Sequence, residues 1–194
     1  MKLPGPTAGL RIGLFGGSFN PAHSGHLHVA QTAMKRLNLD WVWWIVARGN
    51  PLKSQHGDFA QRFASARKIA HDPRMIVTDL EAQLGFTYSW QTLSAIAQRA
   101  PGADFVWIMG ADNMVGFHYW QRWQDIARLM PIAIVARPGV GPGARNAPFA
   151  RMFELQRLPE VMAPLLPGMA PPAWVYLKGP LDPSSSTAIR EGRV

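Results

Sequence analysis

The chain has 194 residues, no cysteine and a formal net charge of +8, and 47% of its residues are hydrophobic against 16% charged. This length suits one well-buried domain, and the composition is that of a globular protein rather than a disordered one. The absence of cysteine excludes disulfides and thiol chemistry and agrees with a reducing cytoplasm, the location that we expect. The positive charge favours anionic partners, either nucleic acid or the phosphates of small nucleotides.

Neither a membrane nor a nucleic acid is expected as a partner. The first residues lack the apolar core of a signal peptide, and no apolar run reaches the roughly 18 residues of a membrane span. No zinc-finger, basic-zipper or RNA-recognition consensus occurs. We therefore expect a single domain over residues 1–194 whose charge serves small nucleotides.

The first apolar run, residues 10–15, predicts a buried strand that ends at Gly16 and Gly17. Paired glycines permit positive φ and a close approach of the backbone to a ligand. Asn20 and Pro21 then turn the chain, and apolar residues recur at helical spacing from about residue 24. A strand, a glycine turn and a helix N-terminus in this order are typical of a phosphate-binding site.

Two histidines, His23 and His26, lie three residues apart at the predicted helix start and so share one face of it. They could simply cap the helix. A zinc site with His28 is a further alternative, but a closed zinc site needs four ligands, and neither a cysteine nor a nearby acid is present.

Residues 16–26, GGSFNPAHSGH, resemble the HxGH signature of the nucleotidyltransferase superfamily, and in this longer form that of the nicotinate-nucleotide adenylyltransferases. The resemblance implies that the two histidines are catalytic and that Asn20 binds the second substrate. It also implies a set of ATP-binding residues: Gly16, Gly17, Ser18, Phe19, His23 and His26.

The next segments continue the alternation of strands and helices. Residues 41–47 predict a strand buried on both faces, residues 59–70 a helix that Asp58 and Gln61 cap, and residues 75–77 a short strand. The loop after residue 47 carries Lys53, which the resemblance implies as a phosphate contact of the second substrate.

Residues 88–99 predict a helix whose entry resembles the family loop that meets the pyridine nucleotide. The resemblance implies that Tyr88 and Ser89 bind the second substrate. Relatives usually have threonine where this chain has Ser89, so the implied contact there is a backbone N–H.

Residues 105–109 predict another buried strand, followed by a G-x-D motif of Gly110 and Asp112 that resembles the nucleotide-facing motif of the family. Both residues are implied in ATP binding. Asp112 could accept from a ribose hydroxyl, or it could instead be the N-cap of the next helix. Beyond it, Trp120 matches the family tryptophan that stacks on the pyridine ring, and Gln121 follows as a second substrate contact.

The last third of the chain predicts strands at residues 132–139 and 174–177. Between them we expect a flexible loop over residues 140–149, a short helix over 151–158 and an extended connection over 159–172, which holds five prolines.

A second signature, residues 184–190, resembles the ISSTxxR motif of the family, with Ser184 in place of an apolar first residue. Hydroxyls at a helix start can cap the helix and donate to phosphate. The resemblance implies that Ser186, Thr187 and Arg190 hold the ATP phosphates and that Arg190 is catalytic. The family normally continues with another helix, which this chain would lack.

These elements predict an α/β fold, a Rossmann-like doubly wound parallel sheet of the nucleotidyltransferase type. The resemblance implies transfer of an adenylyl group from ATP to nicotinate mononucleotide, which yields nicotinate adenine dinucleotide and pyrophosphate in NAD biosynthesis. We expect Mg²⁺ to be bound mainly through the ATP phosphates, with no metal site of the protein itself, because clustered carboxylates are scarce. Nicotinamide mononucleotide or pantetheine phosphate as the acceptor, and a basic nucleic-acid-binding protein, are the alternatives. The sequence does not indicate an oligomeric state.

Overall fold

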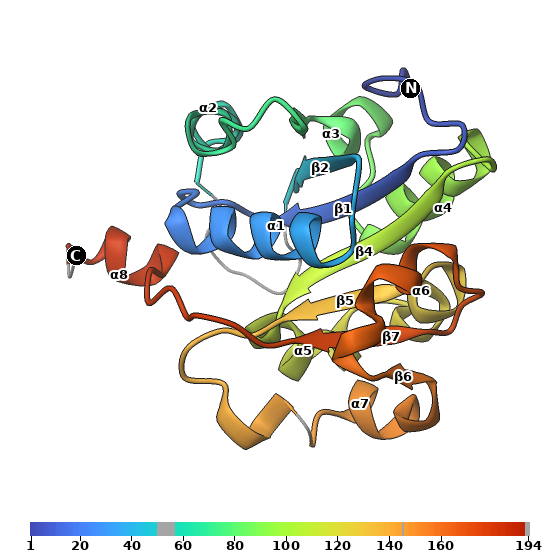
Figure 1. Cartoon of the computed structure of the whole chain (residues 1–194). Helices are drawn as coiled ribbons and strands as arrows, with labels where there is room; N and C mark the ends of the chain where they lie inside the picture. The colour runs from blue at the N-terminus through green and yellow to red at the C-terminus, as the bar shows by residue number, and fades with distance from the viewer. Residues whose placement is uncertain (50–56, 145, 193–194) are drawn as a thin grey trace.

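A seven-stranded, all-parallel sheet of order β3-β2-β1-β4-β5-β7-β6 forms the centre of the computed structural model (Figure 1). The structure describes residues 1–49, 57–144 and 146–192. The expected doubly wound α/β fold is confirmed. The strands are β1 Arg11–Gly17, β2 Trp41–Val46, β3 Met75–Thr78, β4 Asp104–Gly110, β5 Ile132–Val135, β6 Arg157–Leu158 and β7 Trp174–Leu177.

Helices cover both faces of this sheet. They are α1 Ser24–Arg36, α2 Phe59–Ile69, α3 Leu80–Leu84, α4 Ser89–Arg99, α5 Ala111–Gly116, α6 Trp123–Leu129, α7 Pro148–Met152 and α8 Ser186–Arg190, with 3₁₀ segments η1 Phe117–Tyr119, η2 Gly141–Ala144, η3 Glu154–Gln156 and η4 Glu160–Gly168. Buried residues of α1, α2 and η4 join one core, and those of α3 to α7 join the other. Within the described ranges, no helix combines the length and the apolar character needed to cross a bilayer.

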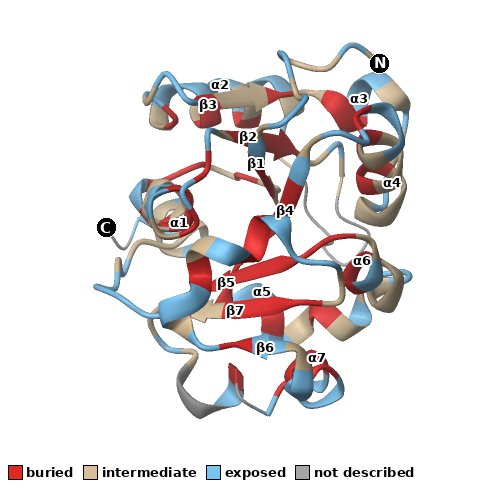
Figure 2. Cartoon of the chain, turned by 45° about the vertical axis from the view of Figure 1, so that its right-hand side comes forward, coloured by how far each residue is buried: buried red, intermediate tan, exposed pale blue. Residues whose placement is uncertain are grey.

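The continuous apolar runs of the sequence follow from this arrangement. In β2, Trp43 and Ile45 pack into the core beneath α4, whereas Val42 and Trp44 pack into the core beneath α1. Successive side chains of a strand point to opposite faces, so a strand covered on both faces must be apolar at every position. Figure 2 shows the resulting buried band through the central strands.

The order of the strands runs outward in one direction from β1 and in the other from β4. The two strands are neighbours in parallel register, with Leu14 opposite Trp107. A crevice therefore lies at their carboxyl ends, which is where open α/β sheets bind ligands.

Three expectations for the last third of the chain are wrong. Residues 140–149 are not simply a loop, because they include η2 and the start of α7 and bury Phe149. Residues 151–158 do not form one helix, since α7 ends at Met152 and the chain continues through η3 into the edge strand β6. Residues 159–172 are not extended, because η4 occupies most of them.

The prolines explain the last of these errors. Pro164 and Pro167 lie inside η4, whose Leu166 is fully buried. The φ angle that proline imposes lies within the range of a 3₁₀ helix, so a proline-rich segment can take this form where apolar side chains anchor it. The helix α3 was not expected either, because five residues are too few for a periodic pattern.

Candidate active site

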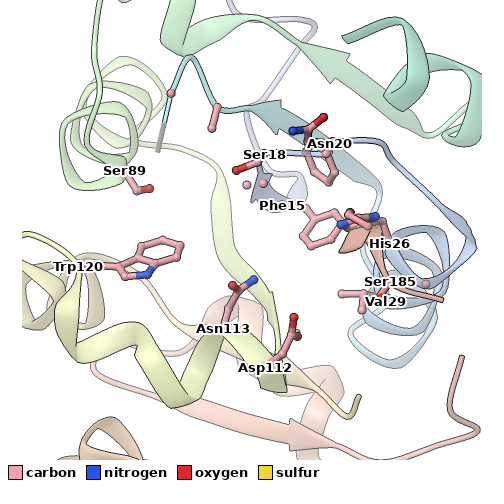
Figure 3. A pocket seen from close by; sticks show the side chains of 18 of the residues that line it. Phe15, Ser18, Asn20, His26, Val29, Ser89, Asp112, Asn113, Trp120 and Ser185 are labelled. Atoms are coloured by element: carbon pink, nitrogen blue, oxygen red, sulfur yellow. The ribbon is translucent and has the colours of Figure 1, made fainter. Parts of the chain in front are cut away.

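A pocket with a volume of about 620 Å³ opens at the carboxyl ends of β1 and β4 (Figure 3). All candidate site residues except Lys53, which lies outside the described residues, line this pocket: Gly16, Gly17, Ser18, Phe19, Asn20, His23, His26, Tyr88, Ser89, Gly110, Asp112, Trp120, Gln121, Ser186, Thr187 and Arg190. The fold thus brings together residues from both ends of the chain and from its middle. The role of each residue is still a prediction.

The two histidines lie side by side at the start of α1. His23 is the N-cap of this helix, and the centroids of the two rings are 3.8 Å apart. The backbone N–H of His23 donates to Nδ1 of His26 at 3.2 Å. A nitrogen that accepts a hydrogen bond carries no proton, so neutral His26 holds its proton on Nε2 and is a donor there.

His23 is uncharged at neutral pH. Burial, and next the positive charge of Arg137, lower the pKa of His23 to about 4. Its Nδ1 is buried, and no atom of the described residues hydrogen-bonds to it. A buried polar atom without a partner is costly, so this nitrogen is available to a ligand or to water.

The glycines after β1 are needed for space rather than for positive φ. Gly16 and Gly17 are absent from the described glycines with positive φ. A Cβ on Gly16 would meet the ring of Trp107, and one on Gly17 would lie 2.9 Å from the ring of Phe19. Of the two properties that paired glycines permit, positive φ and close approach, this pair therefore does not use positive φ.

Phe19 itself takes the unusual conformation, with φ of 46°. Its side chain is 1% exposed and packs against Phe15 and Trp44. Its contribution to an ATP site would therefore come mainly from its backbone.

The C-terminal signature contacts the first signature directly. Arg190 Nη1 donates to the carbonyl of Asn20 at 2.6 Å, and Ser186 Oγ donates to the carbonyl of Pro21 at 2.9 Å. Ser185 caps α8, where its Oγ accepts from the N–H of Ala188. The predicted capping role of the hydroxyls is thus confirmed for this serine, and the two motifs form one continuous wall.

Arg137 follows β5 and contacts both Ser184 and Asp112 at this wall. The sequence shows only a basic residue after a strand and does not reveal this role. Arg137 Nη2 donates to the carbonyl of Ser184 at 2.7 Å, and its Nε lies 3.9 Å from Oδ1 of Asp112. The same guanidinium lies where a Cβ on Gly25 would project. The glycine of the HxGH motif therefore gives Arg137 its place beside the histidines.

Asp112 is not a helix N-cap. Gly110 occupies that position of α5, and Asp112 lies in the first turn, with an exposed side chain at the pocket. Figure 3 shows Asn113 beside Asp112. Asn113 also lines the pocket, although no sequence motif indicated it.

The opposite wall comes from the start of α4 and from the segment after η1. Tyr88 and Ser89 open α4, and Trp120 and Gln121 follow η1. Trp120 is half-buried, and its ring packs edge-on against Phe117 with a centroid distance of 5.4 Å. Figure 3 shows Ser89 and the Trp120 indole at one side of the pocket, away from His26.

Two buried charged residues support the pocket from behind, and sequence reasoning missed both. Arg62 of α2 is 3% exposed and donates to four backbone carbonyls, those of Ser18, Ala47, Arg48 and Gly57. Glu81 of α3 lines the pocket and accepts from the N–H of Arg48 at 3.0 Å. Burial raises the pKa of Glu81 to about 7.

No group of three or more histidine or acidic side chains is placed to hold a metal ion in the part of the chain that the structure describes. The carboxylates at the pocket, Asp112 and Glu81, come from different elements. The donor set is instead one of imidazoles, hydroxyls, guanidinium groups and backbone N–H groups, which suits phosphate oxygens.

The chain has relatives among known proteins over almost its whole length. Residues 14–192 match the cytidylyltransferase-like family. A probable nicotinate-nucleotide adenylyltransferase of Methylorubrum extorquens is 50% identical over 184 residues, which span 93% of this chain and 99% of that protein. One from a Caulobacter species is 51% identical over 183 residues, which span 93% and 97% of the two chains.

A solved structure shares the fold at low sequence identity. The nicotinic acid mononucleotide adenylyltransferase of Plasmodium falciparum, complexed with NaAD, superposes with a TM-score of 0.68 at 19% identity and covers 93% of this chain and 82% of that one.

Proposed function

This chain belongs to the nicotinate-nucleotide adenylyltransferases of the cytidylyltransferase-like family, and from that premise we propose how its pocket carries out the reaction. The enzyme transfers the adenylyl group of ATP to nicotinate mononucleotide and releases pyrophosphate, a step of NAD biosynthesis. One observation carries the proposal: His23 and His26 share a pocket with Ser186, Thr187 and Arg190 from the far end of the chain.

The reaction requires no base from the protein. The attacking group is a phosphate oxygen of the mononucleotide, which is already ionised near neutral pH, and it displaces pyrophosphate from the α-phosphorus of ATP. Charge grows on the α-phosphate and on the leaving pyrophosphate, so preorganised donors are the main catalytic need. His26 supplies its Nε2–H, which the contact at Nδ1 holds in the donor tautomer. His23, uncharged beside it, offers a second hydrogen-bonding group at the same place.

The β- and γ-phosphates lie against the C-terminal motif. Arg190 uses Nη1 and Nη2 for Asn20 and Thr187, and a guanidinium has further N–H groups to offer to phosphate oxygens. Ser186 and Thr187 add hydroxyls at the start of α8. MgATP as the substrate would bring the metal whose charge offsets that of the phosphates, and Asp112 would contact the ribose of the same nucleotide.

The acceptor binds against the wall formed by α4 and the segment after η1. Trp120 stacks on the pyridine ring, the backbone N–H groups near Tyr88, Ser89 and Gln121 meet its carboxylate, and Asn20 contacts the mononucleotide. Lys53 is proposed as a phosphate contact from the sequence resemblance alone. Stacking recognises any flat ring, so the donors must select the acid.

Pyrophosphate release from MgATP tests this function. The purified protein is assayed with nicotinate mononucleotide, nicotinamide mononucleotide and pantetheine phosphate, and each product is identified by mass. We expect the nicotinate nucleotide to give the highest kcat/KM. A preference for pantetheine phosphate, or no transfer to any of the three, would overturn the proposal.

A further inference from the structure

A hydrogen bond between the half-buried Trp90 and the exposed Gln121 joins the two halves of the acceptor wall, which are the start of α4 and the segment after η1. Trp90 Nε1 of α4 donates to Oε1 of Gln121 at 2.9 Å. An indole N–H can only donate, so it can only pair with the oxygen of the amide. The Gln121 amide is therefore held in one of its two orientations, with its oxygen toward Trp90.

Trp90 is itself held on its face. The guanidinium of Arg122 lies 4.1 Å from the centroid of the Trp90 ring, and Arg122 Nε donates to Oδ2 of Asp125 at 2.6 Å. Arg122 has a φ of 55°, the left-handed region that a side chain other than glycine rarely adopts. The indole is thus bound by a cation at its face and by an amide at its edge, which limits its rotation.

This arrangement leaves the Nε2 amide group of Gln121 with two N–H donors. No acceptor for them exists among the residues that the structure describes. Gln121 also lines the pocket, directly after Trp120. The free polar atom of this side chain is therefore a donor, and it is next to the residue on which the acceptor ring stacks.

We propose that the Gln121 Nε2 group donates to the ring carboxylate of the acceptor and that Trp90 is the positioning residue that keeps it a donor. This inference rests on the proposed function. A free glutamine amide could rotate by 180° and offer its oxygen to a ring amide instead. With its oxygen held by Trp90, Gln121 discriminates against nicotinamide mononucleotide and favours the charged nicotinate, because charge-assisted hydrogen bonds are the stronger ones.

The test is the selectivity ratio, defined as kcat/KM for nicotinate mononucleotide divided by kcat/KM for nicotinamide mononucleotide at saturating MgATP. Gln121→Glu keeps an oxygen for Trp90 but presents a carboxylate to the acceptor, so we expect the ratio to fall by at least about tenfold, or about 1.4 kcal/mol. Trp90→Phe keeps an aromatic ring at this position but removes the indole N–H together with the five-membered ring that carries it, so the amide can turn. We expect a smaller fall in the ratio, with kcat/KM for the nicotinamide nucleotide rising.

Gln124→Glu is the matched control, because it makes the same change on α6 outside the pocket lining. It should keep the wild-type ratio. KM for ATP and the unfolding midpoint are also measured for Trp90→Phe, because structural damage would change both. Such damage would lower kcat/KM for the two mononucleotides together, whereas loss of positioning changes their ratio.

The outcomes distinguish this inference from the proposed function. Wild-type protein that does not adenylylate either mononucleotide overturns the function. Wild-type protein that prefers the nicotinate nucleotide, combined with unchanged ratios in Gln121→Glu and Trp90→Phe, overturns the role of Gln121 alone. An equal loss of ratio in Gln124→Glu would also overturn it, because the effect would then be one of general charge.

Discussion

The two walls of the pocket are held together in different ways. The wall that we propose for ATP, called the ATP wall, contains His23, His26, Ser186 and Arg190. Two of its side chains donate to backbone carbonyls 165 and 170 positions away in sequence. The acceptor wall, which we propose for the mononucleotide and which includes Trp120 and Gln121, depends on one contact between the exposed Gln121 and the half-buried Trp90. The first wall is therefore part of the fold, whereas the second can change without unfolding the protein.

This difference separates the two tasks of the enzyme. Additional negative charge develops on the α-phosphate and the leaving pyrophosphate in the transition state, and stabilising it requires donors that do not move. Choosing one ring over another requires only a difference in binding energy, which one side chain can supply. Substitutions in the ATP wall should lower kcat, and those in the acceptor wall should change the selectivity ratio.

The largest effect is expected from His26→Ala. Loss of one preorganised donor should lower kcat by roughly 10²- to 10³-fold, which corresponds to about 2.7–4 kcal/mol. KM for ATP should change little, since the donor acts on charge that forms later. Steady-state kinetics against His28→Ala, a change on the same helix outside the pocket lining, is the measurement. Near-normal kcat in His26→Ala would remove this histidine from the mechanism.

Arg62→Met tests whether the pocket depends on its buried support. The substitution leaves four carbonyls without their guanidinium donor, and we expect the free energy of unfolding to fall by about 3 kcal/mol. Urea denaturation measures this fall. Arg67→Met on the exposed side of α2 should cost less than about 0.5 kcal/mol, and equal losses in the two variants would contradict the role of Arg62.

Glu81 makes the stability of the folded protein depend on pH. Burial raises the pKa of Glu81 to about 7, so between its unfolded pKa and about pH 7 the folded state binds more protons than the unfolded state. Stability from this group is full below the unfolded pKa and is lost as the pH rises through 7. Glu81→Gln should therefore gain stability relative to wild type, on the order of 2 kcal/mol from pH 5 to pH 8.

Unfolding free energies of both proteins, measured at several pH values, check this sign. Glu154→Gln, at an exposed position, should show no such trend. A Glu81→Gln curve that runs parallel to wild type would mean that Glu81 has the same pKa in the folded and unfolded states.

The elements predicted well from the sequence are those that neighbouring residues along the chain determine. The strand β2 is six apolar residues in a row, and the start of α1 follows a glycine turn with its histidines. The segments predicted wrongly depend on distant partners. The helix η4 forms where Leu166 packs against the sheet, and β6 exists because Arg157 and Leu158 pair with β7.

The same reasoning explains which site residues were found. His23 and Arg190 lie inside recognisable motifs, so their place at the pocket could be predicted without a structure. Arg62 and Arg137 act through carbonyls 5 to 47 positions away, and neither residue differs in the sequence from an ordinary surface cation. Gln121 was predicted, but the orientation of its amide depends on Trp90, 31 positions earlier.

The smallest effect is expected from Arg190→Lys, which weakens the ATP wall without dismantling it. Lysine keeps the charge but loses the planar fork that lets Arg190 hold Asn20 and Thr187 and still offer N–H groups to phosphate. We expect KM for ATP to rise by about five- to tenfold, near 1 to 1.4 kcal/mol, and KM for the mononucleotide to stay within about twofold, because the acceptor wall does not contact this residue. Arg151→Lys, at an exposed position outside the pocket lining, should change neither constant. An equal rise in both KM values would mean that Arg190 supports the whole pocket through Asn20, which we propose as a contact of the mononucleotide, rather than holding the triphosphate itself.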